Sequence, residues 1–135
     1  MTGPFVAFHT ERFLDEQPDE ELDQWFLGKD LATWLYDRLI QKPQIISRWA
    51  PFEEDWHGWS LGLQVEGVRF QINIWNVGPR TWIIGLELKL GLLGAFRKRK
   101  AGSAMRALKD VFSELLVVPD FHDVEWHDRW PLSRI

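Results

Sequence analysis

The sequence contains no cysteine, which removes two classes of chemistry. A chain without cysteine has neither a disulfide framework nor a thiolate nucleophile. Long apolar runs are also missing, because the longest, Trp82 to Leu86, falls far short of the roughly 20 residues that a membrane span requires. Residues 1–13 lack the basic start and apolar stretch of a secretory signal. We therefore expect a cytoplasmic protein that makes no contact with a membrane.

Neither sign of charge dominates, but the two signs are unevenly distributed along the chain. The formal net charge is −4. Residues 1–60 carry 12 acidic and 5 basic residues (net −7), whereas residues 61–135 carry 8 acidic and 11 basic residues (net +3). The overall acidity argues against a general nucleic-acid binder, which needs a basic footprint. The asymmetry suits attraction between the two halves or the orientation of a partner.

Three consecutive segments alternate between apolar and polar residues. They cover residues 59–66, 68–75 and 82–90, and Gly67 and Gly78-Pro79 separate them. Alternation with a period of two, joined by short glycine turns, is typical of hairpins. We predict a three-stranded antiparallel meander with one apolar face. A fourth strand is predicted at 123–127, and the stretch 43–57 is predicted as a loop.

Two segments have the spacing of amphipathic helices. Residues 31–39 place apolar side chains on one stripe behind Asp30, a suitable N-cap, and residues 101–116 form a longer stripe that Pro119 ends. One apolar sheet face and two apolar helix stripes must cover each other. The predicted fold is therefore α+β: a two-layer sandwich in one domain, residues 1–135, with two main helices on the meander and its fourth strand.

The polar face of the meander is the first candidate site. It is expected to present Arg69, Gln71, Asn73, Trp75 and Ile83. Tryptophan is enriched at the centres of protein interfaces, so these residues are candidates for partner binding. The alternative is structural: Trp75 packs across the strands over Gly85.

Three further motifs suggest chemistry. Arg97, Lys98, Arg99 and Lys100 form a basic run that indicates an anion or acidic-partner contact, or else a solvated loop. Asp123, Glu125 and His127 fall on one face of the last predicted strand, where they suit a metal or acid–base site, or else a charged edge strand. Ser60 lies in a Gly-x-Ser-x-Gly motif, but a strand runs through it, so the catalytic elbow is rejected.

Short motifs give the chain a resemblance to a known family. They are Phe8 and Arg12-Phe13, Gly28-Lys29-Asp30-Leu31-Ala32 with Trp34-Leu35 and Leu39, and Glu54-Asp55-Trp56 followed by Gly58-Trp59. With these motifs the chain resembles a family of small uncharacterised bacterial proteins. His57 departs from the Glu-Asp-Trp-Gly-Trp form of that family. The resemblance implies the fold and a bacterial cytoplasmic setting, and it brings no assigned activity.

Three functions remain open from the sequence. The first is a non-enzymatic protein-binding module, similar in architecture to immunity proteins or secretion chaperones, with another protein as partner and no cofactor. The second is a metal-assisted hydrolase that uses Asp123, Glu125 and His127. The third is a small-molecule sensor with an apolar pocket lined by Trp34, Trp59 and Trp82. A homodimer through an exposed sheet edge or face is also open.

Overall fold

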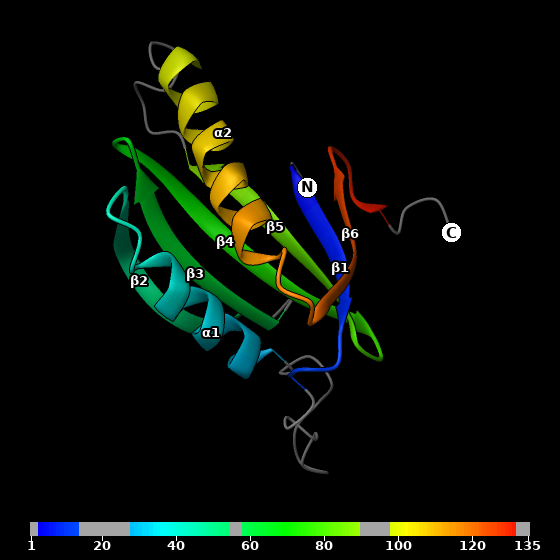
Figure 1. The fold of residues 1–135 in the computed structure, drawn as a ribbon. Helices are drawn as coiled ribbons and strands as arrows, with labels where there is room; N and C mark the ends of the chain where they lie inside the picture. The colour runs from blue at the N-terminus through cyan, green and yellow to red at the C-terminus, as the bar shows by residue number, and fades with distance from the viewer. Residues whose placement is uncertain (1–2, 14–27, 55–57, 90–97, 132–135) are drawn as a thin grey trace.

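The computed structural model describes residues 3–13, 28–54, 58–89 and 98–131 (Figure 1). In chain order the elements are β1 (Phe5–Thr10), α1 (Lys29–Leu39), β2 (Ile45–Glu54), β3 (Gly58–Val65), β4 (Val68–Gly78), β5 (Thr81–Lys89), α2 (Lys98–Leu115) and β6 (Phe121–His127). No helix in the described ranges is long and apolar enough to cross a membrane.

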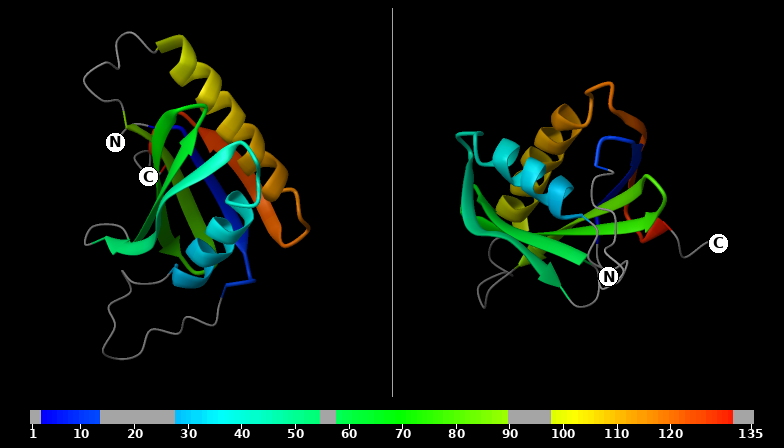
Figure 2. Two further views of the ribbon diagram at one scale, coloured as in Figure 1. Left: turned by 90° about the vertical axis from the view of Figure 1, so that its left-hand side faces the viewer. Right: turned by 90° about the horizontal axis from the view of Figure 1, so that it is seen from below.

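The six strands form one sheet in the order β2-β3-β4-β5-β1-β6, and all of the neighbouring strands are antiparallel. The first strand of the chain thus lies between β5 and the last strand, β6. Both helices cover the same side of the curved sheet: α1 lies over β2 and β3, and α2 crosses β3 and β4 obliquely (Figures 1 and 2). We call the side that carries the helices the inner face and the opposite side the outer face.

The predicted fold, a three-stranded meander with a fourth strand on two helices, is wrong. The three segments do pair in succession as β3, β4 and β5, but they are the middle of a six-stranded sheet, and 49% of the described residues are strand against 28% helix. The largest miss is β2, which was predicted as a loop. Its pairing with β3 shifts register between Ser47 and Trp49 and again between Trp49 and Phe52. These bulges break the period-two pattern by which strands are recognised.

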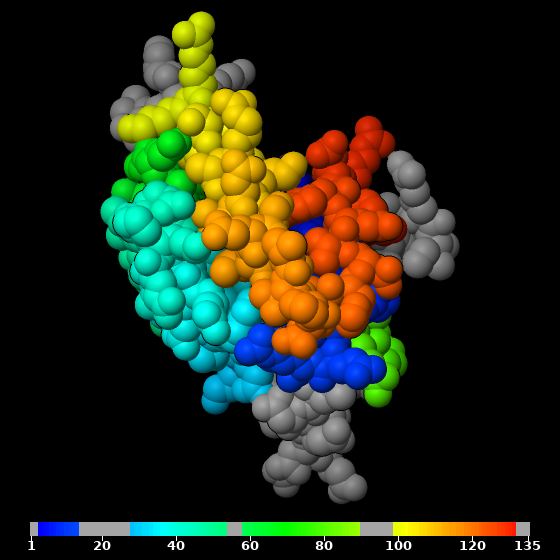
Figure 3. Space-filling model, viewed as in Figure 1, coloured from blue at the N-terminus to red at the C-terminus, as the bar shows by residue number. Residues whose placement is uncertain are grey.

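The inner face carries the hydrophobic core. Alternate residues of β3, β4 and β5 face the helices there, and nearly all of their side chains are inaccessible to solvent. The buried residues of these three strands on this face are Trp59, Leu61, Leu63, Val65, Val68, Phe70, Ile72, Ile74, Trp82, Ile84 and Leu86. In the space-filling view from the helix side, α2 fills the space between α1 and β6 (Figure 3). Burial of these apolar side chains is the main driving force for folding.

Both helices begin earlier than predicted. The N-cap of α1 is Gly28 rather than Asp30, with φ +125°, and its carbonyl accepts a hydrogen bond from the Ala32 amide at 2.8 Å. A Cβ at Gly28 would lie 3.2 Å from the Trp82 ring and 3.3 Å from the Trp59 ring. Glycine therefore supplies both the left-handed backbone and the close approach of the helix to the sheet.

Candidate functional site

The outer face is arranged in transverse rows, because residues paired across antiparallel strands point to the same side. Three adjacent rows run from β2 across the sheet. They are Ile46–Gln64–Arg69–Lys89, then Trp49–Gly62–Gln71–Glu87, then Phe52–Ser60–Asn73–Gly85–Phe5. Three of the predicted partner-binding residues, Arg69, Gln71 and Asn73, lie within these rows.

Hydrogen bonds connect the middle of these rows into what we call the polar network. The hydroxyl of Ser60 and the amide nitrogen of Gln71 each donate to Oδ1 of Asn73 at 2.8 Å. The amide nitrogen of Asn73 donates to Oε2 of Glu87 at 3.1 Å, and Nζ of Lys89 donates to Oε1 of Glu87 at 3.0 Å. The network thus crosses β3, β4 and β5 without a break.

Burial holds the centre of the polar network in place. The exposed fraction is 0% for Ser60 and 6% for Asn73, although both lie on the face opposite the core. Gln71 and Glu87 are half-buried, and Lys89 is exposed. Buried polar groups that are fully hydrogen-bonded keep one orientation, because losing a partner is costly there. The network is therefore a preformed arrangement of donors and acceptors.

The outer face of β2 carries three apolar side chains, Ile46, Trp49 and Phe52, which we call the β2 apolar stripe. Ile46 is 58% exposed and Phe52 is 38% exposed. Trp49 lies flat over Gly62, whose missing side chain makes room for the indole ring. Its Nε1 atom is buried, and among the described residues it has no hydrogen-bond partner. An exposed apolar stripe beside a fixed polar network is a candidate interface.

Trp75 lies at the other end of the outer face, where it is half-buried and packs against neighbouring aromatic rings. Its ring lies over Gly85, with centroids 6.1 Å from Phe5 and 4.9 Å from Trp130. Ile83, the other apolar residue of the predicted partner site, is only 1% exposed. The structural alternative, Trp75 packed across the strands over Gly85, therefore describes this end of the face.

The basic run begins α2 instead of forming a loop. Lys98, Arg99 and Lys100 occupy its first turn, and Arg97 lies outside the described residues. Arg99 and Lys100 are exposed. A Cβ at Gly67, in the turn between β3 and β4, would lie 3.3 Å from Nζ of Lys100. The run therefore reaches the end of the sheet at which β4 begins.

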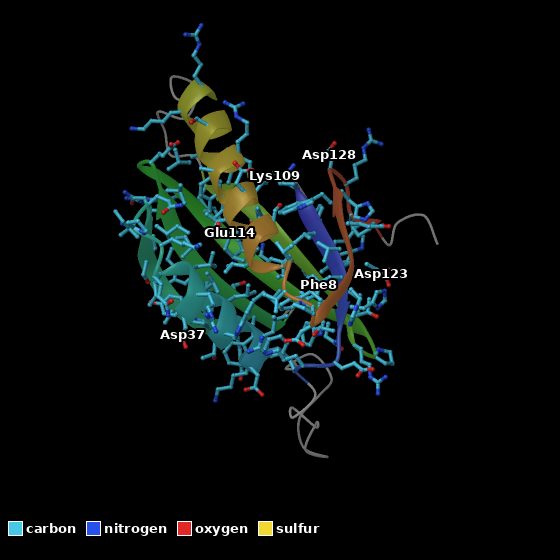
Figure 4. The ribbon with its side chains drawn as sticks, viewed as in Figure 1. Phe8, Asp37, Lys109, Glu114, Asp123 and Asp128 are labelled. Carbon is cyan, nitrogen blue, oxygen red and sulfur yellow. The ribbon has the colours of Figure 1, made fainter. Side chains whose placement is uncertain are left out.

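Of the three predicted metal ligands, Glu125 and His127 lie close together, but the three form no group that could hold a metal ion. Asp123 has φ +55°, and the pairing of β1 with β6 shifts register between Ala7 and His9. This bulge resets the alternation and leaves Asp123 projecting from the strand, away from α2 (Figure 4). Nε2 of His127 lies 3.6 Å from Glu125. No three His, Cys, Asp or Glu side chains in the described ranges gather closely enough to hold a metal ion.

The bulge also changes which histidine shares the outer face. The alternation that puts Asp123, Glu125 and His127 on one face would turn His122 to the other face, but His122 instead pairs with His9, and both histidines are exposed. On the inner side of the same strand, Nζ of Lys109 from α2 lies 5.0 Å from the Trp126 ring centroid. The positive φ of Asp123 therefore affects which side chains of β6 lie on the outer face, and the alternation of residue types does not reveal it.

The three tryptophans of the predicted sensor pocket have different surroundings. Trp59 and Trp82 are 8% and 3% exposed, and both belong to the core beside Gly28. Trp34 is half-buried and packs against Phe13 and Phe121, with ring centroids at 5.8 and 5.3 Å. These contacts are those of core filling.

Comparisons of the chain with protein-family models, with curated proteins and with solved structures found no match. The resemblance to a family of small bacterial proteins therefore stays a prediction. The geometry of the outer face is the feature that indicates a function.

Proposed function

We propose that this chain is a non-enzymatic protein-binding module that contacts its partner through the outer face of the sheet. The observation that supports the proposal is the exposure of Ile46 and Phe52 on the outer face, where Phe52 pairs with Ser60 of the polar network. Apolar and aromatic side chains that fill a partner's pockets supply most of the free energy of binding at interfaces. A bacterial cytoplasmic setting, which the resemblance implies, is part of the proposal.

The polar network supports the same proposal. An interface that already holds its donors and acceptors in place loses little side-chain entropy when it binds. Asn73 and Ser60 are held by burial, while Gln71 and Glu87 remain partly accessible to a partner. The apolar stripe would supply affinity, and the fixed polar groups would select among partners.

The two sheet edges favour contact through the face over sheet extension. At one edge, β2 carries two register shifts and Pro51, which has no amide hydrogen to donate. At the other edge, β6 is bulged at Asp123 and carries Glu125 on its surface. Bulges, proline and charge all hinder the pairing of a second strand. The same argument disfavours a homodimer formed through an edge.

The test is a quantitative affinity capture from a bacterial cytoplasmic lysate with three forms of the protein. The test variant is Ile46→Ser combined with Phe52→Ser, which removes the exposed apolar groups without touching the core. The control is Val117→Ser, because Val117 is 73% exposed but follows α2 in the helix layer. We expect the parent and the control to recover one partner in stoichiometric amount, and the double variant to lose it.

Two results would contradict the proposal. One is that the parent protein recovers nothing in stoichiometric amount. The other is that the double variant recovers the same partner as well as the control does. Recovery of a second copy of the chain, followed by sedimentation as a dimer that the double variant abolishes, would identify the partner as the protein itself.

A further inference from the structure

Two cations face each other on the outer face. Arg69 of β4 is paired directly with Lys89 of β5, and both are exposed. Like charges at directly opposed positions repel and destabilise a sheet. Lys89 has Glu87 as a carboxylate partner, at 3.0 Å. Arg69 has no ion pair within the described part of the chain.

A second set of cations lies at the amino end of a helix, where the helix dipole repels positive charge. Arg99 and Lys100 lie in the first turn of α2, and that turn contains no acidic residue. The amino end of a helix carries partial positive charge, so cations there are unfavourable. Neither residue forms an ion pair with the described residues. Elsewhere Arg80 pairs with Glu11, and Lys42 pairs with Glu114.

Both sets lie at the same end of the molecule. Nζ of Lys100 reaches the turn at Gly67, two residues before Arg69 along the chain. Figure 1 shows the start of α2 above the end of the sheet at which this turn lies. We call Arg69, Lys89, Arg99 and Lys100 the basic end. Lys100 brings one cation of the α2 set to the turn that leads into Arg69, so an external anion bound at this end of the sheet would offset both unfavourable placements.

The row that contains Arg69 indicates the chemistry of that anion. Ile46, 58% exposed, lies in the same transverse row, followed by Gln64, Arg69 and Lys89. Four adjacent strands about 4.8 Å apart make the row roughly 14 Å long, which about four residues of extended chain span. An apolar site at one end and two cations at the other fit a short acidic segment with an apolar side chain.

We infer that the basic end binds an acidic segment of a partner protein, with an apolar side chain of that segment seated against Ile46. This inference rests on the proposed function and specifies its partner. A short acidic peptide is favoured over nucleic acid because residues 1–60 carry a net charge of −7, which repels a long polyanion.

The test measures binding of a fluorescent hexapeptide of Glu and Asp with one central leucine, by anisotropy at two salt concentrations. We expect saturable binding that weakens as salt rises. Combining Arg69→Gln with Lys100→Gln should weaken it about three- to tenfold. The control, Arg80→Gln, removes an exposed cation at the opposite end of β4 and should leave the affinity unchanged. Arg69→Gln alone should raise the melting temperature by about 1–4 °C at low salt.

Several outcomes overturn the inference. One is that a peptide with Gln and Asn in place of Glu and Asp binds as tightly as the acidic peptide. Another is that the variant with Arg69→Gln and Lys100→Gln binds the acidic peptide as tightly as the parent does. The others are that duplex DNA binds more tightly than the peptide, or that the peptide does not bind at all. If any of these occurs while the Ile46 and Phe52 variant still loses its captured partner, only the acidic segment is excluded. If that variant keeps its partner, the proposed function itself fails.

Discussion

The two faces of the sheet are built from the same strands, but different kinds of contact stabilise them. On the inner face apolar residues occupy alternate positions of the strands, and the two helices pack against β2, β3 and β4. On the outer face aromatic rings lie over Gly62 and Gly85, with the polar network between them. On the inner face, a residue of similar hydrophobicity and volume can therefore replace another. On the outer face the structure depends on specific pairs of residues, so the identity of each residue matters more.

The largest effect is expected on the inner face. Trp82→Ala removes a core side chain that is 3% exposed and packs beside Gly28. Loss of the buried ring and the cavity left behind should lower the free energy of unfolding by about 3–5 kcal/mol. Denaturant unfolding followed by circular dichroism measures it. A variant as stable as the parent would show that the core does not depend on this ring.

Gly62→Ala tests the fit of a ring on the outer face. The added Cβ would collide with the fused ring of Trp49, so we expect a loss of about 1–3 kcal/mol. In a Trp49→Ala background the same substitution should cost less than about 0.5 kcal/mol, because the obstacle is gone. Equal losses in both backgrounds, measured by denaturant titration, would mean that the backbone and not the ring requires glycine.

Asn73→Ala tests the polar network. It removes the common partner of Ser60, Gln71 and Glu87, so the hydroxyl of Ser60, which is 0% exposed, loses an acceptor. We expect a loss of about 1–2 kcal/mol in the free energy of unfolding. Glu11→Ala, which breaks an exposed ion pair with Arg80, is the control and should cost less than about 1 kcal/mol. If Asn73→Ala and Glu11→Ala lower the free energy of unfolding by the same amount, the polar network stabilises the fold no more than an exposed ion pair does.

The smallest effect is expected for the β2 apolar stripe. Ile46→Ser should lower the free energy of unfolding by no more than about 0.5 kcal/mol, because Ile46 is 58% exposed, and Phe52→Ser by about 1 kcal/mol, because Phe52 is 38% exposed and packs against Trp49. Thermal unfolding in parallel with the capture experiment measures this. If the free energy of unfolding falls by several kcal/mol, the β2 apolar stripe supports the fold. Failure of the double variant to capture a partner would then not show that the stripe binds that partner.

Sequence reasoning recovered the regular parts of the molecule and missed the irregular ones. The segments that became β3, β4 and β5 were predicted because alternation there is unbroken and glycine turns separate them. The strand β2 was missed because two bulges and Pro51 remove the alternation, although Ile45, Ile46, Trp49 and Phe52 belong to residue types enriched in strands. That enrichment was the available signal.

The candidate site was predictable only in part, for the same reason. Arg69, Gln71 and Asn73 were placed correctly on the outer face, because β4 alternates regularly. His122 was misplaced because the bulge at Asp123, where φ is positive, cannot be read from the residue types. The role of Glu87 depends on pairing across three strands, and one strand's pattern does not contain that information.

The position of β1 has a consequence for how the chain acquires its structure. This strand is synthesised before the other five strands, yet its neighbours in the sheet, β5 and β6, are made much later. The hairpins of β3, β4 and β5 join residues close in sequence and can form as soon as they emerge, whereas β1 must wait for distant partners. During synthesis we therefore expect β1 to stay without its sheet neighbours, with Val6 and Phe8 exposed, until β5 and β6 have been made.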